Sequence, residues 1–211
     1  MLTMPEIKIC GLKSVEQIYM INKYDIDYVG FVFAESKRQV TPELAKEMRS
    51  KLRRGIKAVG VFVDTPIEEV NQIAKYCHLD IVQLHGNEKD DECSRSIVPV
   101  WKALSVQDKE VLNRLEEYKA IQGFVFDSGK GGSGKTFSWD LIKGISSKYF
   151  TILAGGLNSE NVVQGIREVN PHIVDVSSGV ESKGEKDESK IKAFIKAVKT
   201  CNTFYENYPH L

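Results

Sequence analysis

Four reactive side chains stand where short apolar runs of the sequence end. Cys10 closes one such run, Arg38 and His85 follow two others, and Asp127 closes a fourth. Taken singly, each has an ordinary explanation: a small buried thiol, a surface cation, a structural histidine and a turn or N-cap carboxyl. Brought together at one site, they would supply a base, an acid and a guanidinium that can bind a carboxylate. The combination indicates acid–base chemistry.

A glycine-rich run offers a different chemistry, because it fits the phosphate-binding pattern G-x-x-x-x-G-K-[ST]. The run GKGGSGKT covers residues 129–136 and follows an apolar stretch that ends on Asp127. Such a loop wraps backbone N–H groups around a nucleotide triphosphate and adds a lysine, here Lys135. Loops of that class lead directly into a helix, whereas here residues 137–140 intervene before any helical pattern. Nucleotide binding is therefore kept as the minor alternative.

The elements that would position these residues alternate between apolar runs and amphipathic stretches. Several runs are nearly continuous in Val, Ile and Phe, which is typical of strands buried on both faces of a parallel sheet. Helix-start signals lie between them, including capping-box spacing and threonine–proline pairs. The predicted strands cover residues 7–10, 28–33, 57–63, 81–84, 100–104, 121–126, 151–154 and 173–176. The helix signals are Ser14 with Gln17, Thr41-Pro42, Thr65-Pro66, Ser159-Glu160 and the stretch 189–199.

Eight β-then-α units in 211 residues predict an α/β fold, a single-domain (β/α)₈ or TIM barrel with a closed parallel sheet and outer helices. We expect the barrel to cover residues 1–200 and the segment 201–211 to be a tail of unassigned role. An open doubly wound sheet has the same local patterns and is the competing fold. In a barrel the chemistry lies at the carboxyl ends of the strands, where all four reactive side chains fall.

Composition excludes several classes of protein. Lys and Arg number 29 against 29 Asp and Glu, so nothing indicates a nucleic-acid partner or an anionic membrane surface. No apolar stretch approaches 18 residues, and the N-terminus does not resemble a signal peptide. Cys10, Cys77, Cys93 and Cys201 lack zinc-ligand or disulfide spacing. We expect a cytoplasmic protein with reduced thiols and no metal.

The loops after the seventh and eighth strands could hold a phosphate. Gly155 and Gly156 permit close approach of the backbone, and Ser178 and Gly179 could add a hydroxyl and N–H groups one unit later. An isolated glycine pair is usually only a turn. Barrels commonly bind a substrate phosphate at these two loops, so the matching pair favours a phosphate site.

Seven segments together resemble the phosphoribosylanthranilate isomerase family, in order from about residue 7 to about residue 198. They are KICG at 8–11, GFVF at 30–33, SKR at 36–38, VQLHG at 82–86, GGSGKTF at 131–137, GGL at 155–157 and DVSSGVE at 175–181. The resemblance implies a (β/α)₈ fold, no cofactor and a step of tryptophan biosynthesis. That step is the Amadori rearrangement of N-(5-phosphoribosyl)anthranilate to 1-(2-carboxyphenylamino)-1-deoxyribulose 5-phosphate. The glycine-rich run then belongs to a lid after strand six and binds no nucleotide.

The resemblance also implies roles for nine residues. The general base is Cys10, the general acid is Asp127, and Arg38 binds the anthranilate carboxylate. The remaining substrate-binding residues are His85, Gly155, Gly156, Asp175, Ser178 and Gly179. Two features depart from the family pattern: the segment 127–130 is shorter than in some relatives, and Glu35 replaces a proline or neutral residue.

The rearrangement requires a protonated acid and a deprotonated base near pH 7. Asp127 would donate a proton to the ring oxygen, and the Cys10 thiolate would remove a proton from C2′. The pKa of Cys10 should therefore lie below its usual value of about 8.5. Lys8 has the same strand parity as Cys10 and would lie one layer below it, where a buried cation favours the thiolate. Pairing of Lys8 with a barrel carboxylate is the equally weighted alternative.

A related isomerase of histidine biosynthesis is the main functional alternative. By its family pattern that enzyme uses aspartates at the ends of strands one and five, whereas strand one here ends in Cys10. The expected partner is the phosphorylated sugar–anthranilate substrate, and the chain is expected to be a monomer or a homodimer.

Overall fold

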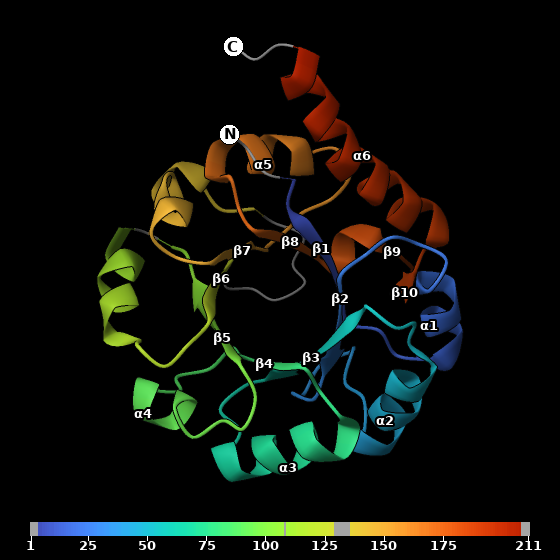
Figure 1. Ribbon diagram of the computed structural model, residues 1–211, viewed down its shortest axis with the longest axis vertical. Coiled ribbons are helices and arrows are strands. Elements are labelled where there is room, and N and C mark those ends of the chain that lie inside the picture. Colours follow the sequence, from blue (N-terminus) through green and yellow to red (C-terminus); the bar gives the residue numbers. More distant parts are fainter. Residues whose placement is uncertain (1–3, 108, 129–135, 208–211) are drawn as a thin grey trace.

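Eight parallel strands form a closed barrel in the order β1 to β8 in this computed structural model, which describes residues 4–107, 109–128 and 136–207 (Figure 1). The closed sheet confirms the predicted TIM barrel and excludes the open doubly wound sheet. The strands are β1 (Glu6–Cys10), β2 (Tyr28–Val32), β3 (Lys57–Phe62), β4 (Ile81–Leu84), β5 (Val100–Ser105), β6 (Gly123–Asp127), β7 (Thr151–Leu153) and β8 (Ile173–Val176).

Helices surround the barrel, but the regular alternation that we predicted weakens in the middle of the chain. The described residues between β5 and β6 contain only one 3₁₀ segment, and those between β6 and β7 contain only two short ones. None of the described helices is long and apolar enough to cross a membrane. The α-helices are α1 (Val15–Ile21), α2 (Pro42–Lys51), α3 (Ile67–Cys77), α4 (Asp90–Cys93), α5 (Val162–Val169) and α6 (Glu188–Asn207). The 3₁₀ segments are η1 (Lys109–Glu117), η2 (Trp139–Ile142), η3 (Ile145–Ser147) and η4 (Ser178–Val180).

The helix-start signals are confirmed at α2 and only partly elsewhere. Thr41 caps α2 by accepting from a backbone N–H, and Pro42 is the first helical residue. At α3 the prediction was wrong, since Pro66 occupies the N-cap position and no side chain caps the helix. Ser14 caps α1, but the Gln17 amide accepts from the Lys13 N–H at 2.8 Å, so no reciprocal capping box forms.

Two C-terminal boundaries also differ from the prediction. Helix α5 begins at Val162, two residues after the predicted signal Ser159-Glu160, because Asn158 and Asn161 first form a hydrogen-bonded turn. Helix α6 continues through Asn207, so the predicted boundary at residue 201 falls inside a helix. Residues 208–211 lie outside the described part of the chain.

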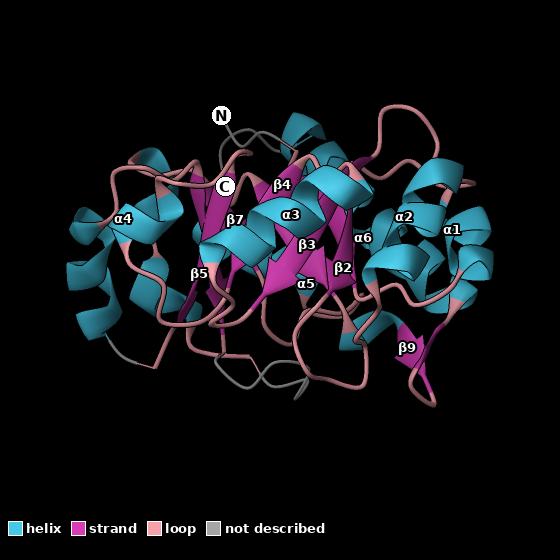
Figure 2. Cartoon of the chain, turned by 90° about the horizontal axis from the view of Figure 1, so that it is seen from below, coloured by secondary structure: helices cyan, strands magenta, loops and turns pink. Residues whose placement is uncertain are grey.

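A small hairpin follows β8 and lies between α6 and α1 at the rim of the barrel (Figures 1 and 2). It consists of η4 and the antiparallel strands β9 (Glu181–Ser182) and β10 (Glu185–Lys186), in which Glu181 faces Lys186. This hairpin was not predicted, because strands of two residues carry no periodicity.

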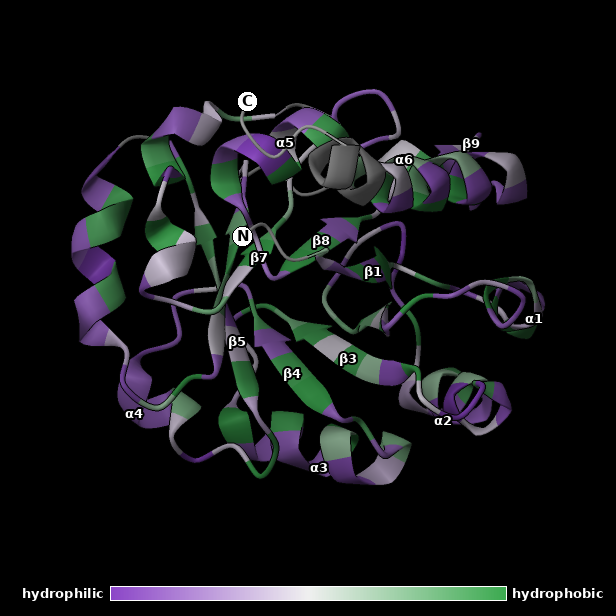
Figure 3. Cartoon of the chain, turned by 45° about the horizontal axis from the view of Figure 1, so that its top comes forward, coloured by the Kyte–Doolittle hydropathy of each residue, from purple (hydrophilic) through white to green (hydrophobic). Residues whose placement is uncertain are grey.

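The interior of the barrel is layered, and its layers follow strand parity. Apolar residues from strands β2 to β8 form one cluster, in agreement with the mainly hydrophobic strands of Figure 3. Gln83 lies two residues beyond Ile81 on β4, and Asp175 lies two residues beyond Ile173 on β8. On these two strands a polar residue therefore follows the apolar one on the inward face. The cluster contains Tyr28, Val59, Ile81, Trp101, Ala103, Val125, Ile152, Ala154 and Ile173.

Candidate active site

A cavity of about 340 Å³ lies at the carboxyl ends of the strands and collects eight of the nine predicted site residues. They come from loops and strand ends on six different strands, as expected for a barrel enzyme. Gly179 is the exception, because it does not line the cavity. The eight residues are Cys10, Arg38, His85, Asp127, Gly155, Gly156, Asp175 and Ser178.

A buried ion pair forms the floor of the cavity. Lys8 is fully buried, and its Nζ lies 2.6 Å from Oδ2 of Asp175 and 3.0 Å from Oε1 of Gln83. The pair forms because β1 and β8 close the barrel with Lys8 and Asp175 as register partners. The other oxygen of Asp175, Oδ1, is buried and has no hydrogen-bond partner among the described residues. It is therefore an unused acceptor directly below the cavity.

Cys10 lies at the end of β1 and is buried. Burial raises the pKa of its thiol, while the nearby Lys8 cation acts in the opposite direction. The predicted net lowering of this pKa is therefore wrong, because loss of hydration outweighs the cation. The two explanations of Lys8 are compatible: it pairs with Asp175 and also favours the Cys10 thiolate.

Close packing of glycine fixes the position of the Cys10 sulfur. Gly30 is the β2 partner of Cys10, and a Cβ on Gly30 would lie 2.5 Å from Cys10 Sγ. The GFVF segment thus begins with glycine because only a hydrogen leaves room for the thiol at this point.

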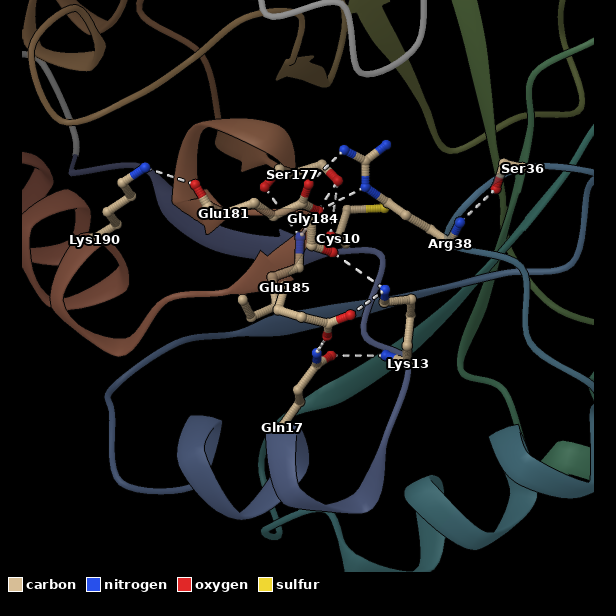
Figure 4. A network of polar contacts seen from close by, with 11 residues as sticks. Cys10, Lys13, Gln17, Ser36, Arg38, Ser177, Glu181, Gly184, Glu185 and Lys190 are labelled. Atoms are coloured by element: carbon tan, nitrogen blue, oxygen red, sulfur yellow. Dashed lines mark hydrogen bonds and ion pairs between the residues drawn. The ribbon is translucent and has the colours of Figure 1, made fainter.

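Arg38 lies beside Cys10 and already binds a carboxylate of the chain itself (Figure 4). Its Nε and Nη2 donate to the two carboxylate oxygens of Glu181 at 2.7 and 2.8 Å. The stem of Arg38 passes over Gly11, whose φ of +79° and lack of a side chain allow the close approach. Burial alone would raise the pKa of Glu181, but hydrogen bonds from Arg38 and Lys186 lower it to about 2.

Asp127 and His85 occupy the opposite side of the cavity. Asp127 is the last residue of β6 and is half-buried, and Oδ1 accepts from the Ser128 hydroxyl at 3.2 Å. Burial lowers the pKa of His85, while the charge of Asp127 opposes that shift. The histidine is thus held toward its neutral form, in which it both donates and accepts a hydrogen bond.

The loops after β7 and β8 form a third side, which is the predicted phosphate site. Gly155 and Gly156 have φ angles of +79° and +67°, which favour glycine. A Cβ on Gly155 would lie 2.6 Å from the Ser128 backbone nitrogen, so the loops after β6 and β7 are in close contact. A Cβ on Gly179 would overlap the carbonyl of Leu157. Gly179 therefore allows two loops to pack together, while Ser178 faces the cavity.

The structure does not support the alternative that residues 129–136 bind a nucleotide. Residues 129–135, including Lys135 and the predicted lid glycines, lie outside the described part of the chain. The described residues 136–138 are not helical, and the 3₁₀ turn η2 follows them. A phosphate-binding loop of that class requires a helix N-terminus at this position. Across the described residues, no group of three or more His, Cys, Asp or Glu side chains could hold a metal ion.

Several residues of the site were not predicted from the sequence. Ser177 lines the cavity, and its hydroxyl donates to the Cys10 carbonyl at 3.0 Å. Gln83 was part of a recognised segment, and its parity with Ile81 could have placed it inside the barrel. Glu181 ends a recognised segment, but nothing in its spacing indicated that it pairs with Arg38. Lys186 had no signal, because it reaches Glu181 only across the hairpin.

Comparison with known proteins identifies one family. The family model described as "N-(5'phosphoribosyl)anthranilate (PRA) isomerase" matches residues 7–197. The chain is 50% identical over 198 residues to the N-(5′-phosphoribosyl)anthranilate isomerase of Clostridium kluyveri, covering 93% of this chain and 98% of the relative.

Solved structures agree. The phosphoribosyl anthranilate isomerase of Thermotoga maritima superposes with a TM-score of 0.87 at 39% identity, over 93% of this chain and 100% of that one. A phosphoribosyl anthranilate isomerase in complex with reduced 1-(o-carboxyphenylamino)-1-deoxyribulose 5-phosphate gives a TM-score of 0.85 at 37% identity, with the same two coverages of 93% and 100%.

Proposed function

The chain belongs to the N-(5′-phosphoribosyl)anthranilate isomerase family and is an isomerase of tryptophan biosynthesis, and from this premise we propose that Cys10 and Asp127 carry out its proton transfers. The reaction converts N-(5-phosphoribosyl)anthranilate into 1-(2-carboxyphenylamino)-1-deoxyribulose 5-phosphate. One observation carries the assignment: a single cavity brings a thiol, a carboxyl, a guanidinium and a glycine-rich wall together. The histidine-biosynthesis alternative is not favoured, because β1 ends in cysteine and the relatives are anthranilate isomerases.

Asp127 is the general acid in the first step. Its carboxyl donates a proton to the furanose ring oxygen, the C1′–O bond breaks, and the nitrogen lone pair forms a C1′=N bond. The product is a cationic Schiff base with an open sugar chain. The position of Asp127 at the end of β6, half-buried beside the loop after β7, supports this role.

Cys10 is the general base in the second step. The thiolate removes the proton on C2′, and the electrons of that C–H bond neutralise the iminium to give an enolamine. The enolamine then gains a proton at C1′ and loses one from the C2′ hydroxyl, which yields the ketone. Burial raises the pKa of Cys10, and the positive iminium together with Lys8 acts against this rise and favours the thiolate in the second step.

The remaining cavity residues hold the two anionic ends of the substrate. Arg38 binds the anthranilate carboxylate, and Gly155, Gly156 and Ser178 bind the phosphate. Oδ1 of Asp175, which has no partner in the described part of the chain, accepts from the substrate amine or a sugar hydroxyl. Anchoring at both ends orients C2′ toward the base, which converts binding energy into rate.

Consumption of phosphoribosylanthranilate, followed by its fluorescence, tests the assignment. Cys10→Ser and Asp127→Asn should each lower kcat by about 10² to 10⁴ while circular dichroism stays unchanged. Cys93→Ser is the matched control, because Cys93 is also a buried thiol but lies outside the cavity. Full activity in both cavity variants would refute the proposed proton transfers.

We also propose that the enzyme is cytoplasmic and is a monomer or a homodimer. Its four free cysteines support a reducing compartment. For the related Thermotoga maritima protein, a solved structure describes monomers generated from a dimeric enzyme. Sedimentation equilibrium of the purified chain distinguishes the two states.

A further inference from the structure

We infer that Glu181 and Lys186 are positioning residues that set the preference for a carboxylated substrate. Glu181 fixes the orientation of the Arg38 guanidinium, and Lys186 keeps the cluster of these three side chains net positive. The inference rests on the proposed role of Arg38 as the site for the anthranilate carboxylate. Figure 4 shows Glu181 beside Arg38, and neither Glu181 nor Lys186 needs to touch the substrate.

The orientation of Arg38 is set by Glu181. Both oxygens of the Glu181 carboxylate accept from Arg38, and the two side chains are only 9% and 6% exposed. A two-point contact of this kind fixes the guanidinium plane, which a single hydrogen bond does not do. The contact uses Nε and Nη2, and no hydrogen bond of Nη1 to a described residue is present. Arg38 also lines the cavity, so Nη1 is a donor held ready for an incoming anion.

The charge of the cluster is restored by Lys186. An arginine that is fully paired with a glutamate presents no net charge to a substrate. Lys186 Nζ lies 2.8 Å from Oε1 of Glu181 and 3.0 Å from the Ser177 carbonyl, and its side chain is 1% exposed. Burial lowers the pKa of Lys186, but the Glu181 carboxylate opposes that shift and favours the cation. Two cations and one carboxylate then leave a net charge of +1 beside the cavity. Because all three groups are nearly dehydrated, this charge is weakly screened and acts strongly on a nearby carboxylate.

The hairpin that carries both residues is tied to the rest of the fold. Lys13 Nζ lies 2.7 Å from Oε1 of Glu185, and the Gln17 amide donates to Oε2 of the same carboxylate at 2.9 Å. On the other side, Lys190 Nζ donates to the Glu181 carbonyl at 2.6 Å. The hairpin is thus fastened to α1 and α6, so the direction of Arg38 depends on the ring of helices.

The test compares two substrates that differ only in the carboxylate: phosphoribosylanthranilate and N-(5-phosphoribosyl)aniline. The ratio of their kcat/KM values measures what the carboxylate contributes. In Lys186→Met this ratio should fall about tenfold, mainly through KM of the carboxylated substrate, as expected for the loss of one charge-assisted interaction. Lys186→Arg should restore much of the ratio. Lys199→Met is the matched control, since it removes a lysine from an exposed ion pair on α6.

A second variant keeps the inference falsifiable if Lys186→Met does not fold. Glu181→Asp preserves every charge but shortens the carboxylate by one methylene, so it should misplace Arg38 and also lower the ratio. An equal loss of kcat/KM for both substrates in these variants would reduce Glu181 and Lys186 to a structural role and overturn the inference. If Arg38→Met leaves the ratio unchanged, Arg38 does not bind the carboxylate and the inference fails with that role. This result differs from the one that would leave Arg38 in its role and refute only the positioning by Glu181 and Lys186.

Discussion

Removal of the buried cation at position 8 should weaken the fold and the base together. In Lys8→Met the Asp175 carboxylate loses a partner at 2.6 Å, and its other oxygen already lacks a partner among the described residues. Removing one member of a buried pair costs about 3–5 kcal/mol, because the other charge stays buried without compensation. For a domain of this size, that loss corresponds to a fall in Tm of roughly 6–20 °C.

Thermal and urea unfolding of four proteins measure this effect: the wild type, Lys8→Met, Asp175→Asn and the double variant. The double variant removes both charges, so it should recover a large part of the free energy of unfolding lost in Lys8→Met. Burial raises the pKa of Asp175, and Lys8 is the main group that opposes this shift. Without Lys8 the carboxyl will take up a proton more readily, so the destabilisation should be largest at neutral pH and smaller near pH 4.

The same variant tests the influence of Lys8 on the base. Lys8 acts to lower the pKa of Cys10, so its loss should raise that pKa further. Alkylation by iodoacetamide as a function of pH, with Cys10 followed by peptide mass spectrometry, reports the change. An unchanged Cys10 profile together with a wild-type free energy of unfolding would refute the reasoning on both counts.

Three further outcomes follow from contacts already described. Gly30→Ala should cost about 1–3 kcal/mol and lower kcat more than KM, because the new methyl group overlaps Cys10 Sγ; unfolding curves and initial rates measure both, and an unaffected kcat would contradict the packing argument. Glu181 has a pKa of about 2 against 4.5 in the unfolded chain, so its stabilisation is complete above pH 4.5 and is lost as the pH falls toward 2. At about 1.4 kcal/mol per pH unit, this contribution to the free energy of unfolding is about 3 kcal/mol. Glu181→Gln should therefore make the free energy of unfolding fall less steeply below pH 4.5, and an unchanged pH dependence would disprove this role of Glu181. Burial raises the pKa values of Cys77 and Cys93 to about 11, so a thiol-specific disulfide reagent should modify them only in the unfolded chain, and prompt reaction in the native protein would contradict their burial.

The strand-end residues of the site could be predicted because a parallel barrel brings the carboxyl ends of all strands to one rim. Cys10 and Asp127 needed only the ends of two apolar runs to be located, and parity placed Lys8 below Cys10. The partner of Lys8 was left open, since the choice of carboxylate depends on how β1 and β8 close the sheet.

The surroundings of Arg38 could not be read from local patterns. Glu181 lies 143 residues away in sequence, and it reaches Arg38 through strands of two residues that show no alternation. The direction of the Cys10 pKa was also out of reach, because it depends on the balance between dehydration and two nearby lysines in space. After β5 and after β6, the amphipathic pattern did not show whether the chain forms an α-helix or a 3₁₀ segment.

The ion pair between Lys8 and Asp175 makes activity depend on closure of the barrel. These residues are 167 positions apart, and they meet only when the last strand of the barrel docks on the first. Bringing together residues so far apart in sequence costs loop-closure entropy, which slows the formation of such contacts. A nascent chain that has completed seven strands would carry both the base and the acid and still lack the floor of its site. The rate at which activity returns during refolding should therefore report the pairing of β1 with β8. Two complementary fragments of this enzyme should become active only when these two strands pair.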